Sequence, residues 1–229
     1  MARTYTALQL IDQALTRAEQ SGSNFISQNE ALDYLNSARA ELDEFLYSAY
    51  NGDYNLTDYS LTTVANSASY VLPTDFYRLS NVALQEGNRF YSLDRINMRE
   101  KNRMNNSLSA WPRNAGYRIE GTERITFFPT PNNASTIIIT YQPAPAIIID
   151  TSTVIPDYNG YSTFIVDTIA MKVALKMEMY ERVGYLKASR EEWKKAIIEN
   201  AQQNDLTQPG KAFIRGDAWW DDDFDGGYW

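Results

Sequence analysis

The chain has 229 residues, 44% of them hydrophobic, and carries 29 acidic against 21 basic side chains, a formal net charge of −8. It contains neither cysteine nor histidine, which excludes disulfides, thiolate metal sites, cysteine nucleophiles and a Ser-His-Asp triad. Because histidine is the usual general base near neutral pH and the commonest metal ligand, we predict a protein that is not an enzyme and that holds no cofactor or metal.

The first segment, residues 1–59, is predicted to form a helical hairpin. Two capping boxes mark the helix starts, at Thr6 with Gln9 and at Ser27 with Glu30. Apolar residues recur at helical spacing after each box: Leu8, Ile11, Leu15 and Ala18, then Ala31, Leu35, Ala38, Leu42 and Phe45. The Ser-Gly-Ser run at 21–23 breaks the first helix, so the two stripes belong to two helices.

The spacing of apolar residues changes in residues 60–150 from the helical period to that of strands. Short antiparallel strands are predicted there between Gly and Pro turns. The run RLSNVALQEGNRFYSL indicates two strands around Gly87-Asn88, and STIIITYQ indicates another. A short polar helix is predicted at about 95–105. Four or more strands of this kind are typical of a small sandwich or half-barrel inserted between the helical parts.

The register of one hairpin follows from its sequence, YRIEGTERITFF. A three-residue loop at 121–123 places Ile119 opposite Ile125 and Tyr117 opposite Phe127. A two-residue loop would instead place a charged residue opposite Ile125, because a slip of one residue moves every side chain to the other face. We therefore predict the three-residue loop.

Residues 151–207 are predicted to return to helix and to pack on 1–59. One apolar stripe comprises Val166, Ile169, Val173, Met177 and Tyr180, and a neighbouring face carries Met171, Leu175 and Met179. Such an arc is wider than one neighbouring helix requires, so we predict that Met171, Leu175 and Met179 contribute to a subunit interface. The helix is predicted to end near Val183-Gly184 and a second to follow through Leu186, Trp193 and Ile197. The fold class is then α+β, with N- and C-terminal helices packed as a small bundle around an inserted antiparallel β module.

The last segment, residues 208–229, is predicted to be an extended acidic and aromatic arm ending in DAWWDDDFDGGYW. Acidic disordered segments are usually poor in aromatic residues, whereas Trp and Tyr dominate interface hot spots. We therefore predict that the arm docks on a partner, rather than packing on its own body or remaining idle. The residues expected to carry this contact are Trp219, Trp220, Asp221, Asp222, Asp223, Phe224, Tyr228 and Trp229.

The charge outside the arm is almost balanced. Five of the acidic residues lie in 217–229, which leaves 24 acidic against 21 basic residues in 1–216. Proteins that bind duplex DNA through its phosphates normally have more basic than acidic residues. No apolar run approaches the roughly 18 residues of a membrane span, and no signal peptide is evident. We predict no membrane association and synthesis in the cytoplasm.

Three stretches resemble the head-to-tail adaptor proteins of tailed bacteriophages. SYVLPTDFYRLSNVAL is similar to the entry of the family's β unit, with its Leu-Pro-x-Asp-hydrophobic pattern at Leu72, Pro73, Asp75 and Phe76. YRIEGTERITFFPTPNNASTIIITYQPAPA resembles the family's next hairpin and strand, and VIPDYNGYSTFIVDTIAMKVAL its entry into the C-terminal helix. The resemblance spans about residues 28–200 and is spread over the chain.

This resemblance implies a structural virion protein at the portal–tail junction. Its subunits would form a homo-oligomeric ring, commonly of twelve, that binds the portal protein on one side and the tail or nozzle protein on the other. DNA would pass through the channel without specific binding. The aromatic arm is not a motif of the family, so its docking rests on the residues alone.

Two other functions compete with the adaptor. A single-stranded-DNA-binding protein could combine an OB-like β zone with an acidic C-terminal recruitment tail, and "DDDFDGGYW" has that character. The long helices and the missing basic groove argue against it. A carboxylate-based glycan hydrolase is the third alternative, although no pair of acidic residues stands out by its spacing.

Overall fold

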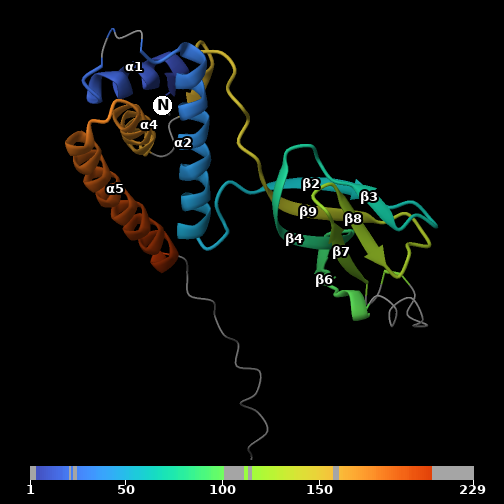
Figure 1. Ribbon diagram of the computed structural model, residues 1–229. Coiled ribbons are helices and arrows are strands. Elements are labelled where there is room, and N and C mark those ends of the chain that lie inside the picture. The colour runs from blue at the N-terminus through green and yellow to red at the C-terminus, as the bar shows by residue number, and fades with distance from the viewer. Residues whose placement is uncertain are drawn as a thin grey trace, which may run out of the picture.

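A computed structural model describes residues 4–20, 22, 25–100, 111–112, 115–156 and 160–207. A helical body and a body of β-sheet lie next to each other, connected by the segments that lead into and out of the sheets (Figure 1). The α+β class with antiparallel sheets, predicted from the sequence, is confirmed.

The helical body has one hydrophobic core that is shared by four helices. These are α1 (Ala7–Arg17), α2 (Gln28–Ala49), α4 (Ser162–Lys176) and α5 (Tyr180–Thr207). Helix α4 contacts each of the other three, and most of its residues are buried (Figure 1). Its wide apolar arc is therefore covered largely by helices of the same chain.

The first helix begins where the sequence predicts. The Thr6 hydroxyl accepts a hydrogen bond from the Gln9 N–H at 3.2 Å, and the Thr6 N–H donates to the Gln9 side chain at 2.9 Å. Its buried face differs from the predicted stripe, because Leu8 is 49% exposed and Leu10 is buried. The helix packs on α4, and its buried face includes small residues at Ala7 and Ala14.

The predicted helix end near Val183-Gly184 is wrong, since α4 ends at Lys176 and α5 continues through Gly184. Glu178 adopts a left-handed conformation with φ of 59°, and the Met179 N–H donates to the Ala174 carbonyl at 2.9 Å. This is a Schellman cap, a motif that usually carries glycine at the left-handed position. A prediction that looks for glycine therefore places the break too late.

The β body consists of two four-stranded sheets. The first has the order β2-β9-β4-β5, made of β2 (Thr57–Thr62), β9 (Thr136–Pro143), β4 (Phe76–Glu86) and β5 (Arg89–Ser92). The second has the order β3-β8-β7-β6, made of β3 (Ser69–Val71), β8 (Arg124–Phe128), β7 (Gly116–Glu120) and β6 (Asp94–Arg95). All pairs are antiparallel except β6 with β7. Both sheets contribute to one core, as expected of a sandwich.

The predicted register of one hairpin and the predicted turn of the other are confirmed. Strands β7 and β8 pair Ile119 with Ile125 and Tyr117 with Phe127, around the three-residue loop. Strands β4 and β5 turn at Gly87-Asn88, where Gly87 has a φ of +61°. The predicted polar helix begins at residue 98, and its continuation beyond residue 100 lies outside the described residues.

One strand pair joins the two ends of the helical body and was not predicted. Strand β1 (Thr4–Thr6) pairs antiparallel with β10 (Val154–Pro156), which joins the first described residues to the segment that returns from the β body. Each strand has three residues, too few for a recognisable alternation of apolar and polar side chains.

Candidate interaction surfaces

The Leu-Pro-Thr-Asp-Phe segment forms the turn between β3 of one sheet and β4 of the other. Leu72 is buried in the shared core, and the carbonyl of Pro73 accepts a 3.0 Å hydrogen bond from the Phe76 N–H. The Phe76 ring lies 5.6 Å from that of Tyr141 on β9, measured between centroids. The Asp75 carboxylate accepts a hydrogen bond from the Tyr141 hydroxyl at 2.8 Å. These contacts give the family pattern a structural role where the chain crosses between sheets.

Removing the Asp75 carboxylate is expected to destabilise the turn between β3 and β4. Burial and the hydrogen bond to Asp75 raise the pKa of Tyr141 to about 12. Asp75→Ala leaves the phenol without its acceptor and is expected to lower the free energy of unfolding by about 1–3 kcal/mol. Asp75→Asn keeps an acceptor and should lose less than about 1 kcal/mol. Urea unfolding of the three proteins tests this, and equal losses in both variants would contradict it.

The segment that returns from β9 runs along α2 before it reaches β10. The Asn36 carboxamide donates to the Ile148 carbonyl and accepts from the Ile148 N–H, both at 2.9 Å. Ile148 is buried, whereas its neighbours Ile147 and Ile149 are 78% and 86% exposed. Side chains alternate between opposite sides in an extended chain, so seating Ile148 against α2 turns the other two isoleucines outward. They form an exposed apolar pair on the segment that leads from β9 to β10.

The β body also touches the helical body at Glu44 of α2. Arg78 of β4 forms an ion pair with Glu44 at 2.9 Å, and the Tyr77 hydroxyl donates to the same carboxylate at 3.2 Å. The Arg78 guanidinium lies 4.5 Å from the centroid of the Tyr47 ring. The hydrogen bond and charge of Arg78 lower the pKa of Glu44. Because the pair is exposed, we assign it no more than about 1 kcal/mol.

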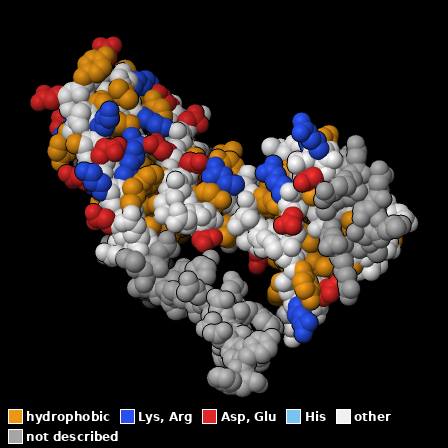
Figure 2. Space-filling model, turned by 90° about the horizontal axis from the view of Figure 1, so that it is seen from below, with side chains coloured by type: hydrophobic (Ala, Val, Ile, Leu, Met, Phe, Trp, Pro, Cys, Tyr) orange, Lys and Arg blue, Asp and Glu red, His pale blue; other side chains and the backbone are white. Residues whose placement is uncertain are grey.

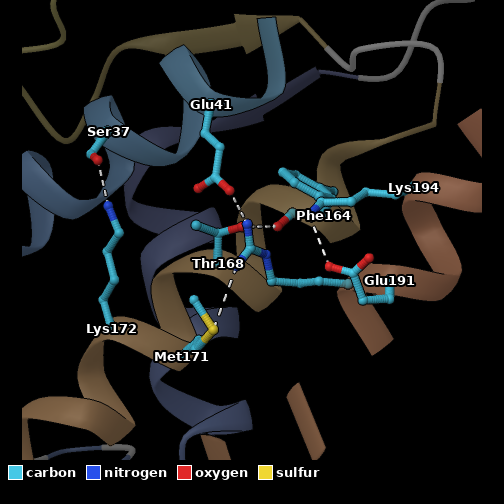
Figure 3. A network of polar contacts seen from close by, with 9 residues as sticks. Ser37, Glu41, Phe164, Thr168, Met171, Lys172, Glu191 and Lys194 are labelled. Atoms are coloured by element: carbon cyan, nitrogen blue, oxygen red, sulfur yellow. Dashed lines mark hydrogen bonds and ion pairs between the residues drawn. The ribbon is translucent and has the colours of Figure 1, made fainter. Parts of the chain in front are cut away.

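Arg190 of α5 contacts both α2 and α4, and Figure 3 shows its partners Glu41, Met171 and Phe164. The buried Arg190 guanidinium forms an ion pair with Glu41 of α2, and one of its nitrogens lies 3.5 Å from the sulfur of Met171 on α4. It also lies 5.0 Å from the centroid of the Phe164 ring. Beside it, Lys172 of α4 donates to the Ser37 hydroxyl of α2. One side chain of α5 thus connects three helices.

The three residues predicted at a subunit contact lie in different environments. Met171 is part of the Arg190 network, and the sulfur of Met179 accepts a 3.9 Å hydrogen bond from the Gln20 amide. Both methionines pack on the helical core, whereas Leu175 is 46% exposed. The wide arc that motivated the prediction is explained within the chain, and the subunit contact itself stays a prediction.

An open cavity of about 620 Å³ between α1, α4 and α5 was not anticipated from the sequence. Its wall includes Asp167, which is 1% exposed and accepts hydrogen bonds from Arg17 and, at 2.8 Å, from Ser189. Trp193 lines the same cavity. An aspartate within the otherwise apolar run of α4 was the available signal. Its two donors satisfy the carboxylate, which explains its place in the core.

Charges on the visible face of the helical body are mixed in sign: Figure 2 shows acidic and basic side chains interspersed there, without an extended field of either. Within the described residues, no group of three or more potential ligands is placed to hold a metal ion. None of the described helices combines the length and apolar character that crossing a bilayer requires. The arm residues 219–224, 228 and 229 lie outside the described residues, so their role stays a prediction.

The features described so far are structural contacts and exposed apolar surfaces on a two-body fold, which are typical of an assembly protein. A comparison with family models identifies the SU10 adaptor protein family over residues 5–212, and the chain belongs to this family of phage head-to-tail adaptors. The family is structural and not enzymatic, and it implies contact with portal and tail proteins and a location in the virion. The resemblance drawn from the three sequence stretches is confirmed at this level. No curated protein matches the chain.

Proposed function

We propose that this protein forms a ring of subunits, twelve as is common for such adaptors, between the portal and the tail or nozzle. The observation that carries the proposal is the family match, which extends from residue 5 to residue 212 and so includes both bodies. In this proposal the helices pack as a bundle around the channel and the β module is inserted between them. The protein is made in the host cytoplasm and retained in the virion.

The charge distribution supports a channel that does not hold its DNA. With 24 acidic against 21 basic residues in 1–216, the subunit offers no basic excess to neutralise phosphates. The mixed signs on the face in Figure 2 agree with this. A ring without a basic excess lets duplex DNA slide. A basic ring would instead bind the DNA phosphates, and the release of counterions would favour that binding.

We also propose that the end of the arm, residues 217–229, docks on the portal or on another partner of the junction. The family match ends at residue 212, so residues 217–229 lie outside the shared sequence. Each of its aromatic side chains offers roughly 150–250 Å² for burial, and Trp and Tyr dominate interface hot spots. The aspartates would keep these rings from aggregating until the partner arrives.

Deleting residues 217–229 tests the arm directly. We expect the truncated chain to keep its circular dichroism spectrum and melting temperature, and to lose attachment to the purified portal. Trp219→Ala with Trp220→Ala should weaken binding by at least about 100-fold, since hot-spot residues contribute about 2–4 kcal/mol each. A matched control, Asp221→Asn with Asp222→Asn, keeps the aromatic area and should keep attachment. A truncated chain that still joins heads to tails would contradict the docking.

Single-stranded DNA binding is the alternative outcome. An OB-fold is a five-stranded, partly open barrel, whereas the described β body has two four-stranded sheets. Salt-dependent binding of a poly-pyrimidine oligonucleotide to the full chain would favour this alternative over the adaptor ring. Electron micrographs of closed rings, for the chain alone or with the portal, would decide for the ring.

A further inference from the structure

The sheet β2-β9-β4-β5 ends in two open edges. Within the part of the chain that the structure describes, no strand pairs with the outer side of β2 or of β5. Every pair in this sheet is antiparallel, and the number of strands is even, so the two edge strands run in opposite directions. A second copy in the same orientation beside the first therefore presents its β2 antiparallel to the first copy's β5.

The backbone of β5 has unused hydrogen-bonding groups on its outer side. The Leu93 N–H donates to the Val82 carbonyl of β4 at 2.8 Å, and the register between the two strands is continuous. Because successive residues of a strand direct their N–H and C=O groups to opposite sides, Arg89 and Tyr91 also bond to β4. Phe90 and Ser92 direct theirs away from the sheet.

The same argument defines the outer side of β2. The Thr63 N–H donates to the Ser135 carbonyl, next to β9, at 2.9 Å. The continuous register from this pair leaves Asp58, Ser60 and Thr62 with their backbone groups directed outward. Both edges are therefore able to accept a further antiparallel strand.

The apolar face of the sheet is incomplete at both edges. One row of side chains crosses it from Leu61 through Ile137 and Leu84 to Tyr91. The two middle residues are buried, whereas Tyr91 is 44% exposed and Leu61 is only partly buried. A second copy joined edge to edge would place its Leu61 beside Tyr91 and cover both.

Neither edge strand contains lysine, proline or a bulge, which are among the features that protect edges against strand addition. The bulges of this sheet lie between β4 and β9. Phe90 on β5 is 61% exposed.

We infer that β5 of one subunit pairs with β2 of a second copy of this chain, so that the sheet continues from subunit to subunit. Such a contact uses a different surface on each partner, and repeating it generates a ring where the rotation closes. The inference rests on the proposed ring and identifies one of its subunit contacts.

Introduced cysteines test the pairing, because the natural chain has none. Ser60 and Ser92 belong to one row on the face of the sheet away from the core, at opposite edges, and both are exposed. Under mild oxidation, the full chain with Ser60→Cys and Ser92→Cys should form a ladder of disulfide-linked multimers. Each single variant alone should remain uncrosslinked, and an equimolar mixture of the two should stop at dimers.

A matched control uses the edges of the other sheet. Val71→Cys with Arg95→Cys places two exposed cysteines on β3 and β6, and no ladder is expected from this pair. Proline at Ser92 removes one outward N–H and leaves the backbone bonds to β4 in place, although it also removes the 2.9 Å hydrogen bond from the Ser92 hydroxyl to Asn81 of β4. It should abolish the β5–β2 contact while the circular dichroism spectrum is retained.

Light scattering of the wild-type chain, alone and with purified portal, separates the two proposals. A ladder in either state, absent from the control pair, supports the inference. Assembly without a ladder, or equal ladders from both pairs, overturns the edge contact and leaves the ring in place. No assembly in either state overturns the ring and the edge contact together.

Discussion

Asparagine in place of Asp43 is expected to raise the free energy of unfolding at pH 7.5 by about 3 kcal/mol. Asp43 lies on α2, is 6% exposed, and its Oδ1 atom has no hydrogen-bond partner. Burial raises the pKa of its carboxyl from 3.8 to about 6, although the charge of Arg39 acts in the opposite direction. At neutral pH the native protein thus carries a buried ionised carboxylate, and asparagine removes that charge at nearly constant volume.

The pH dependence gives the sign of the effect. Because the folded pKa of Asp43 lies above the unfolded value, its contribution to stability is fully present below pH 3.8 and is lost as the pH rises through 6. The pKa values of Glu30 and Glu44 are lowered, so the stability that they contribute is lost below about pH 4.5, outside this window. The free energy of unfolding of the wild-type protein should therefore rise as the pH falls from 7.5 to 4.5.

Urea unfolding at several pH values measures this change. The Asp43→Asn protein should lose most of the pH dependence in that window, whereas Asp33→Asn, an exposed position on the same helix, should behave as wild type. Identical pH profiles for the wild-type and Asp43→Asn proteins would show that the carboxyl is not the group responsible.

Glutamine in place of Glu41 is expected to cost about 3 kcal/mol, because it leaves the buried Arg190 guanidinium without its counter-charge. Replacing Arg190 itself with methionine should change the free energy of unfolding by less than about 1 kcal/mol. The methionine would lie between Met171 and Phe164, and the substitution removes a buried Nε–H that has no hydrogen-bond partner. Replacing one partner of this ion pair should thus destabilise the protein far more than replacing the other.

A double-mutant cycle tests this asymmetry. The combination of Glu41→Gln with Arg190→Met should be nearly as stable as Arg190→Met alone, since the buried guanidinium that Glu41→Gln would leave unpaired is gone. Glu191→Gln is the matched control, because Glu191 pairs with Lys194 on the surface of α5, and its loss should be below about 1 kcal/mol. A cost for Arg190→Met equal to that of Glu41→Gln would contradict the argument.

Features that depend on a few neighbouring residues were predictable from the sequence alone. The capping box at Thr6, the turn at Gly87-Asn88 and the pairing of Ile119 with Ile125 all follow from spacing over a dozen residues or fewer. The crossing segment at Asp75 was recognised as a family pattern. Its partner Tyr141 was not, because that tyrosine is 66 residues away.

The tertiary structure alone decided which surfaces meet. It paired β1 with β10 and used the wide arc of α4 for three helices of the same chain. Among the described residues, it left the outer edges of β2 and β5 without a partner strand. It also placed the left-handed residue of a helix end at Glu178, where no glycine marks it. The physical reason is the range of the forces involved. Backbone hydrogen bonds and side-chain periodicity act within a segment, and packing selects among distant segments whose local patterns fit equally well.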